Sequence, residues 1–130
     1  MTSGREDART IVERYLAALN RHDADGAAGC VSDDFFNEHT SAAGTSVRGR
    51  AEYRARLTDF LERFRDLHYE VEDVIAEDDR LAVPYTMSCT VDDDAVQIRG
   101  MFRFRVDRGL IAHRVDYWDG TEFERQTHPH

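Results

Sequence analysis

The sequence has few of the residues that build cross-linked or metal-bound folds. It contains two cysteines among 130 residues, Cys30 and Cys89, and neither belongs to a C-x-x-C pair or to a spacing typical of metal ligands. We expect both to be reduced, partly buried thiols that pack as small hydrophobic side chains. The sequence therefore predicts neither a disulfide framework nor a zinc site.

Basic residues and long apolar runs are also scarce. The chain has 17 Lys and Arg against 26 Asp and Glu, a formal net charge of −9. Such a charge repels phosphate backbones and anionic lipid, so we expect neither nucleic acid nor a membrane as a partner. No apolar run approaches the roughly 20 residues that cross a bilayer. The N-terminal segment MTSGREDART lacks the apolar region of a signal peptide, and we therefore expect a cytoplasmic protein.

The histidines and short motifs give no sign of a metal or cofactor. His22, His39, His68 and His113 form no H-x-H or H-x-x-x-H pair, and we assign the closing segment 128–130 to a frayed tail. The sequence also lacks a glycine-rich phosphate loop and a G-x-S-x-G nucleophile motif. We therefore predict no bound metal and no cofactor.

Apolar residues recur at helical spacing in the first half of the chain. The first helix is predicted from Ala8, Ile11, Val12, Tyr15, Leu16 and Leu19. Ser3 and Glu6 have capping-box spacing ahead of it, and Asp23 is expected to cap a short second helix that ends at Cys30. A third helix is predicted over residues 50–65, with one apolar face formed by Tyr53, Leu57, Phe60, Leu61 and Phe64.

The second half has the period of two that is typical of strands. We predict a short strand over 31–39 and then four strands over 68–77, 80–91, 96–106 and 110–118. Helices followed by an antiparallel meander indicate an α+β fold. No repeat or flexible linker interrupts the chain, so we expect one domain over residues 1–130. A bent sheet closed by the third helix leaves a conical cavity, which we expect to bind a small molecule.

One predicted strand has a polar outer face, formed by Gln97, Arg99, Met101, Arg103 and Arg105. Such a face is either solvated or the contact between two sheets in a homodimer. We keep both interpretations and expect a homodimer through this face.

Two segments near the C-terminus resemble a known family. The segments GMFRF (100–104) and GLIAHRVDYWD (109–119), followed by Phe123, resemble the last two strands of SnoaL-like polyketide cyclases and equally those of limonene-epoxide hydrolases. Both families belong to the superfamily of nuclear transport factor 2 and ketosteroid isomerase. The resemblance implies a cone-shaped, curved mixed or antiparallel sheet wrapped around helices, in the order α-β-α-β-β-β-β.

The resemblance also implies roles for particular residues. Asp116 matches the carboxylate that projects into the cavity from the final strand in both families; it acts as acid and base in the cyclases and as a catalytic acid in the epoxide hydrolases. His39 matches the end of the first strand, where these enzymes place a polar pocket residue or a base. Asn37 lies two residues earlier, so strand alternation puts it on the same side as His39.

One departure from the epoxide hydrolases is specific. Those enzymes have an Arg-x-Asp triplet on a middle strand, whereas this strand reads LAVPYTMSCT (81–90), without Arg or Asp. The acid–Arg–acid relay of that mechanism is therefore missing, and only a rearranged acid pair would support epoxide hydrolysis.

The residues around Asp116 suggest how its acidity is set. Arg114 and Trp118 share its strand face; the indole would desolvate the carboxylate and raise its pKa, whereas Arg114 would lower it. The alternative is an exposed Asp–Arg pair that contributes little. Asp119 falls on the opposite face, where we expect a strand-end cap or a turn.

Aromatic residues are expected to form the remaining wall. We predict that six aromatic residues divide between the core and the pocket: Tyr15, Tyr53, Phe60, Phe64, Tyr85 and Trp118. Tyr15 and Tyr85 could donate hydrogen bonds to a substrate oxygen. Five of the six, all but Phe64, form the expected substrate-binding set with Asn37 and Arg114, around Asp116 and His39. The leading hypothesis is a cofactor-free enzyme, a cyclase or isomerase acting on a hydrophobic, oxygenated molecule such as a polyketide. The alternatives are a non-catalytic domain that binds a small ligand or dimerises, and an epoxide hydrolase.

Overall fold

Helices dominate the first half of the chain and long strands the second. The computed structural model describes residues 7–42 and 44–127. Within them the elements are α1 (Ala8–Asn20), α2 (Ala24–Ala28), β1 (Val31–His39), β2 (Val47–Arg48), α3 (Arg50–Arg63), β3 (Phe64–Val71), β4 (Ile75–Glu77), β5 (Arg80–Val91), β6 (Asp94–Asp107), β7 (Leu110–Trp118) and α4 (Gly120–Thr127). The predicted α+β class is confirmed.

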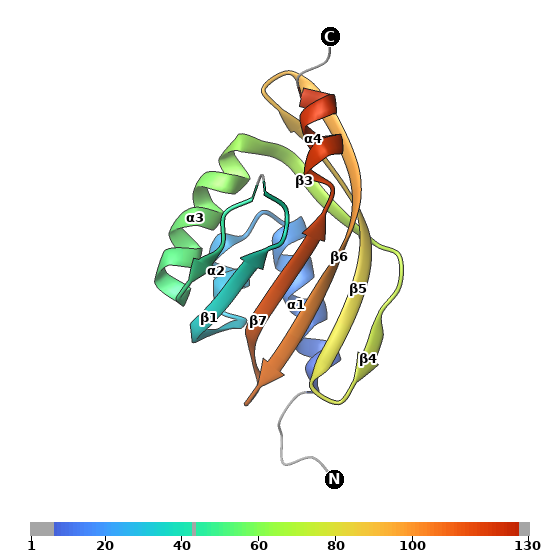
Figure 1. The fold of residues 1–130 in the computed structure, drawn as a ribbon. Helices are drawn as coiled ribbons and strands as arrows, with labels where there is room; N and C mark the ends of the chain where they lie inside the picture. The colour runs from blue at the N-terminus through green and yellow to red at the C-terminus, as the bar shows by residue number, and fades with distance from the viewer. Residues whose placement is uncertain (1–6, 43, 128–130) are drawn as a thin grey trace.

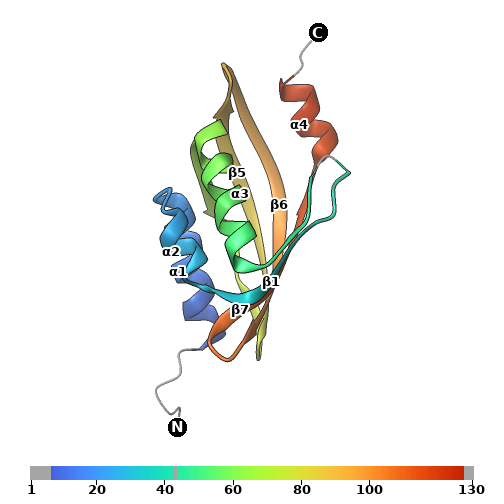
Figure 2. The same ribbon diagram turned by 90° about the vertical axis from the view of Figure 1, so that its left-hand side faces the viewer.

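The strands form one open, mixed sheet. Its order is β2-β1-β7-β6-β5-β3, and β4 pairs with β5 farther along the edge where β3 pairs (Figure 1). β1 runs parallel to β7, and all the other paired strands of the described chain are antiparallel. α1, α2 and α3 lie on one side of the sheet, and β5 and β6 curve around them (Figure 2). The predicted curved sheet packed against helices is therefore confirmed.

The first two helices begin at aspartates that bind free backbone amides. The Asp7 carboxylate accepts from the Thr10 amide at 2.8 Å, and the Asp23 carboxylate accepts from the Gly26 amide at 2.9 Å. The predicted cap at Asp23 is confirmed, although α2 ends at Ala28 and not at Cys30. The capping box expected at Ser3 and Glu6 lies outside the described residues.

Two predicted boundaries around β3 were wrong. Helix α3 ends at Arg63, two residues early, because Phe64 leaves the helical conformation, with φ −97° and ψ 81°, and begins β3. The strand predicted over 68–77 is two strands, β3 and β4, with a break opposite Pro84 of β5. The Pro84 carbonyl accepts from the Glu72 amide at 2.9 Å. In a strand the N–H and the C=O of one residue point to the same neighbour, so the N–H that proline lacks would also have pointed to this break. The ladder therefore loses one hydrogen bond there and the pairing shifts.

The core lies between the helices and the inner face of the sheet. Alternate residues of β5 from Leu81 to Val91 are buried, as predicted, and so is Cys30. Cys30 and Cys89 form no disulfide. The outer face of β6 is exposed at Arg99 and Arg103, and the homodimer expected there stays a prediction. Every helix within residues 7–42 and 44–127 is too short or too polar to cross a bilayer.

Gly100 of β6 leaves room for a side chain from the neighbouring strand. A Cβ at this position would lie 2.4 Å from the Tyr85 hydroxyl oxygen and 2.7 Å from the Tyr117 carbonyl oxygen. Because one of these atoms is backbone, Gly100→Ala cannot be relieved by a side-chain rotation alone. We expect it to lower the free energy of unfolding by about 1–3 kcal/mol, as measured by urea denaturation.

Gly29→Ala is the matched control. Gly29 is exposed with φ −66°, and a Cβ there would come no closer than 3.4 Å to another atom. We expect its effect on unfolding to stay within about 0.5 kcal/mol. Equal stability of the two variants would contradict the close packing at Gly100.

Candidate functional site

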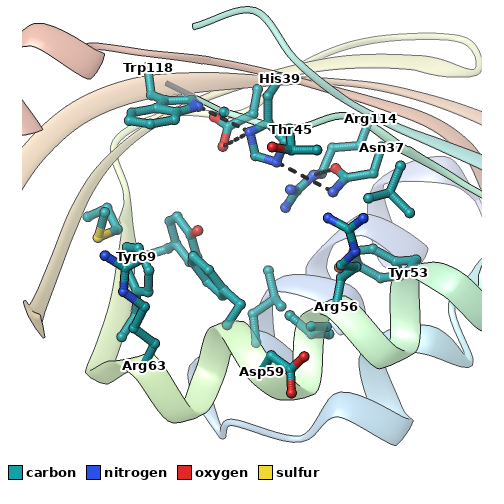
Figure 3. A pocket seen from close by; sticks show the side chains of 18 of the residues that line it. Asn37, His39, Thr45, Tyr53, Arg56, Asp59, Arg63, Tyr69, Arg114 and Trp118 are labelled. Atoms are coloured by element: carbon teal, nitrogen blue, oxygen red, sulfur yellow. Dashed lines mark hydrogen bonds and ion pairs between the residues drawn. The ribbon is translucent and has the colours of Figure 1, made fainter. Parts of the chain in front are cut away.

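A cavity of about 390 Å³ lies between the inner face of the sheet and α3. Figure 3 shows the sheet residues Asn37, His39, Arg114 and Trp118 on one side of it and residues of α3 on the other. Its wall includes eight of the predicted site residues, namely Asn37, His39, Tyr53, Phe60, Tyr85, Arg114, Asp116 and Trp118. Tyr15 differs from the prediction: it is fully buried and does not belong to the lining.

The parallel pairing of β1 with β7 brings the polar residues together. Asn37 is paired with Arg114, and His39 is paired with Asp116. Because alternate residues of a strand face the same side, all four side chains point into the cavity from adjacent strands. Two pairs of residues far apart in the sequence thus form one polar patch.

Asp116 receives a hydrogen bond from across the sheet. The Tyr85 hydroxyl on β5 donates to Asp116 Oδ1 at 2.5 Å. Tyr85 pairs with Gly100 on the intervening strand β6, and the missing side chain there leaves space for the phenol. Asp116 Oδ2 lies 3.8 Å from His39 Nδ1.

Arg114 is directed away from solvent. Its Nε donates to Asn37 Oδ1 at 2.8 Å and its Nη1 donates to the Tyr15 hydroxyl at 3.1 Å. The Tyr15 hydroxyl is also hydrogen-bonded to that of Tyr53. Arg114 and Asp116 are each only 5% exposed, so the alternative of a solvated Asp–Arg pair is excluded.

The sequence matches the family model described as the SnoaL-like domain over residues 12–114. The chain belongs to the SnoaL-like domain family. The match includes Asn37, His39 and Arg114, and Asp116 lies two residues beyond it. Among curated proteins, none has a significantly similar sequence.

Solved structures share the fold of this SnoaL-like domain. A protein from Catenulispora acidiphila with a ketosteroid isomerase-like fold, in complex with trimethylamine, has a TM-score of 0.81 at 14% identity, over 89% of this chain and 90% of that one. An LEH-like epoxide hydrolase from M. tuberculosis has a TM-score of 0.81 at 23% identity, over 92% and 89%. A candidate polyketide cyclase from Xanthomonas campestris has a TM-score of 0.79 at 22% identity, over 95% and 98%. At these identities the likeness establishes the fold alone.

Burial sets the charge states within the SnoaL-like cavity. Desolvation raises the pKa of Asp116, against the lowering effects of Arg114 and of the Tyr85 hydrogen bond. Desolvation, with the positive charge of Arg114, lowers the pKa of His39 to about 4. His39 is therefore a neutral imidazole near pH 7, next to a carboxyl group that takes up a proton more readily than an exposed aspartate.

Several lining residues were not predicted from the sequence. Tyr69 packs edge-on against Tyr85 with ring centroids 5.0 Å apart, and it follows the same alternation as Leu67, which could have identified it. Phe123 lies on α4, a helix that was not predicted. The Asp119 carboxylate accepts from the Glu122 amide at 3.0 Å, so Asp119 caps the start of α4, where a strand-end cap or a turn was expected. The D-x-x-E spacing could have signalled the helix as well.

Replacing Asp116 by Asn will change how stability depends on pH. The folded-state pKa of Asp116 is raised above 3.8, so the folded chain binds this proton more tightly than the unfolded chain. The free energy of unfolding of the parent should therefore fall, relative to Asp116→Asn, as pH rises from 3.8 through the raised pKa. Denaturation of both proteins across this pH range measures the difference. A parent that gains stability relative to the variant with rising pH would contradict the burial of the carboxylate.

His39 has the opposite dependence. Its folded pKa of about 4 lies below the ordinary 6.5, so the unfolded chain takes up this proton first as pH falls. The neutral His39 ring therefore contributes fully to the free energy of unfolding above pH 6.5, and this contribution is lost as pH falls toward 4. NMR of the imidazole C–H groups should show no titration of His39 between pH 8 and 5, with His39→Gln used to assign the signal. A midpoint near 6.5 would show a solvated ring.

Proposed function

We propose that this protein is a cofactor-independent enzyme in which Asp116 transfers a proton on a hydrophobic, oxygenated small molecule, with cyclisation or isomerisation as the outcome. The observation that supports it most is one desolvated carboxyl group on the wall of a cavity beside a neutral imidazole. A carboxyl group whose pKa is raised toward neutrality works better as a general acid or base than an exposed one. The 3.8 Å between Asp116 and His39 lets both groups reach one substrate.

The composition of the cavity supports a largely apolar substrate. Phe60 and Phe64 stack with centroids 4.3 Å apart, Phe64 stacks on Phe123, and the Phe123 ring meets the edge of Trp118. These four rings all line the cavity and form a continuous aromatic wall. Its volume of about 390 Å³ falls in the range of small-molecule sites, roughly 300–1,000 Å³. A flat, multiply oxygenated carbon skeleton such as a polyketide fits this combination.

The proposed chemistry needs one proton carrier. Asp116 as carboxylate removes a proton from the carbon next to a carbonyl group, and the resulting Asp116 acid returns it at another atom. If the proton returns to a different carbon, the product is an isomer. If the carbanion first attacks a second carbonyl of the same molecule, the product is a ring. The cavity wall supplies the proximity and orientation that such a closure requires.

Epoxide hydrolysis is the second candidate, because one structural relative is an epoxide hydrolase. That reaction was expected to need a rearranged acid pair. Asp59 is the other carboxylate among the described lining residues, but it is exposed on α3, whereas Asp116 is buried. Cyclisation or isomerisation by proton transfer needs only one carboxyl group, Asp116. We therefore favour that reaction over epoxide hydrolysis.

Exchange of α-protons for deuterium tests the proposal without knowledge of the natural substrate. A panel of hydrophobic ketones and β-diketones is incubated with the protein in D₂O, and NMR follows the loss of the α-proton signals. We expect catalysed exchange that falls by about 100-fold or more in Asp116→Asn. Gly29 does not line the cavity, so Gly29→Ala should exchange at the parental rate.

Two results would replace this proposal. Hydrolysis of terpene epoxides that depends on Asp116, without α-proton exchange, would establish the epoxide hydrolase. Tight binding of the panel compounds without any turnover would establish a ligand-binding domain.

A further inference from the structure

The hydrogen-bond partners of His39 determine which ring nitrogen has the proton. The indole N–H of Trp118 lies 3.1 Å from His39 Nδ1, and an indole nitrogen can only donate. Nδ1 is therefore the acceptor. A neutral imidazole has one acceptor and one N–H, so the proton of His39 is on Nε2.

The hydrogen bond from Arg114 likewise determines how the side-chain amide of Asn37 is oriented. Arg114 Nε lies 2.8 Å from Asn37 Oδ1, and a guanidinium nitrogen can only donate. The amide oxygen of Asn37 therefore faces Arg114, and its NH₂ group faces His39. Asn37 Nδ2 and His39 Nε2 are 3.5 Å apart. Since both nitrogens bear hydrogen, this contact is not a hydrogen bond between them.

We propose that Asn37 Nδ2 and His39 Nε2 are a two-donor site for one oxygen atom of the substrate, a carbonyl oxygen that becomes an enolate during the reaction. Both residues line the cavity. One oxygen can lie at a normal hydrogen-bond distance of about 2.7–3.2 Å from each of two nitrogens with this separation. The inference rests on the proposed function, because the enolate is the product of the proton transfer to Asp116.

The reaction balances with these three groups alone. Asp116 Oδ2 takes the proton from the α-carbon, the C–H electron pair forms a carbon–carbon double bond, and the carbonyl π pair moves to oxygen. The enolate oxygen then accepts from Asn37 and His39, while Asp116 has become neutral. Return of the proton to carbon, or attack of the enolate carbon on a second carbonyl whose oxygen then takes the proton from Asp116, ends the cycle. The substrate class is therefore an enolisable ketone or β-dicarbonyl compound.

The buried cation behind the two donors favours a negative oxygen. Arg114 holds the Asn37 amide in place and is itself buried, so water screens its charge poorly. Preorganised donors of this kind stabilise developing charge more than flexible ones, because they need no reorientation during the reaction.

The tautomer of His39 can be measured directly on the unmodified protein. Nitrogen-15 NMR of histidine-labelled protein near pH 7 separates protonated from unprotonated ring nitrogens. We expect a protonated Nε2 and an unprotonated Nδ1 for His39. A protonated Nδ1 would overturn the proposal, even if the His39 variants bound ligands as expected.

Binding of an enolate mimic tests the donors independently of turnover. The probe is 4-nitrophenolate, the control ligand is its uncharged methyl ether 4-nitroanisole, and calorimetry measures both. The measurements use Asp116→Asn, which imitates the protonated acid that accompanies the enolate. In this background His39→Gln places an amide N–H near the position of Nε2, whereas His39→Asn places it near Nδ1.

We expect the phenolate to bind more tightly than the ether. His39→Gln should change the affinity for the phenolate by no more than about threefold, whereas His39→Asn should lower it roughly tenfold or more. Equal affinities of these two variants, or equal binding of phenolate and ether, would overturn the two-donor site. The outcome is separable from the proposed function, because absence of α-proton exchange with a normal phenolate result would refute the catalysis and leave the oxygen site standing.

Discussion

The guanidinium of Arg114 is a buried positive charge, and the arrangement of the site follows from compensating it. A buried cation is costly unless every donor finds a partner and negative groups lie close by. Arg114 donates to Asn37 and to Tyr15, and its central carbon lies 4.8 Å from the centroid of the Phe102 ring. The negative charge of Asp116 also stabilises the cation. The cation therefore orders β1, α1 and β6 around itself.

The same cation sets the balance at Asp116. Burial alone would favour the neutral acid, and the nearby positive charge partly restores the carboxylate. A group under two opposed influences of this kind can both take and give a proton. The proposed proton transfer depends on this balance at Asp116.

Most helices and strands could be predicted from the sequence, but the contacts between them could not. Periodicity located α1, β5, β6 and β7 because each has one continuous apolar face that follows its own geometry. It could not show that β1 lies beside β7, since parallel neighbours 77 residues apart, such as Asn37 and Arg114, have no local signal. For the same reason Tyr15 and Tyr85 looked equivalent in the sequence, although one contacts the buried cation from beneath the cavity and the other contacts the carboxyl group. The break opposite Pro84 was missed because it depends on how neighbouring strands pair. The short helix α4 was missed although the D-x-x-E spacing of Asp119 and Glu122 is a local signal for the start of a helix.

The parallel register of β1 and β7 has an evolutionary consequence. Side chains alternate between the two faces of a strand, so insertion of one residue between Asn37 and His39, or between Arg114 and Asp116, would turn one member of that pair to the outer surface. Earlier in β1 the register already shifts between Val31 and Phe36, so a change of length can be absorbed there. New specificities in this scaffold are thus expected to arise by exchange of side chains at fixed positions, with the spacing within each pair inherited unchanged.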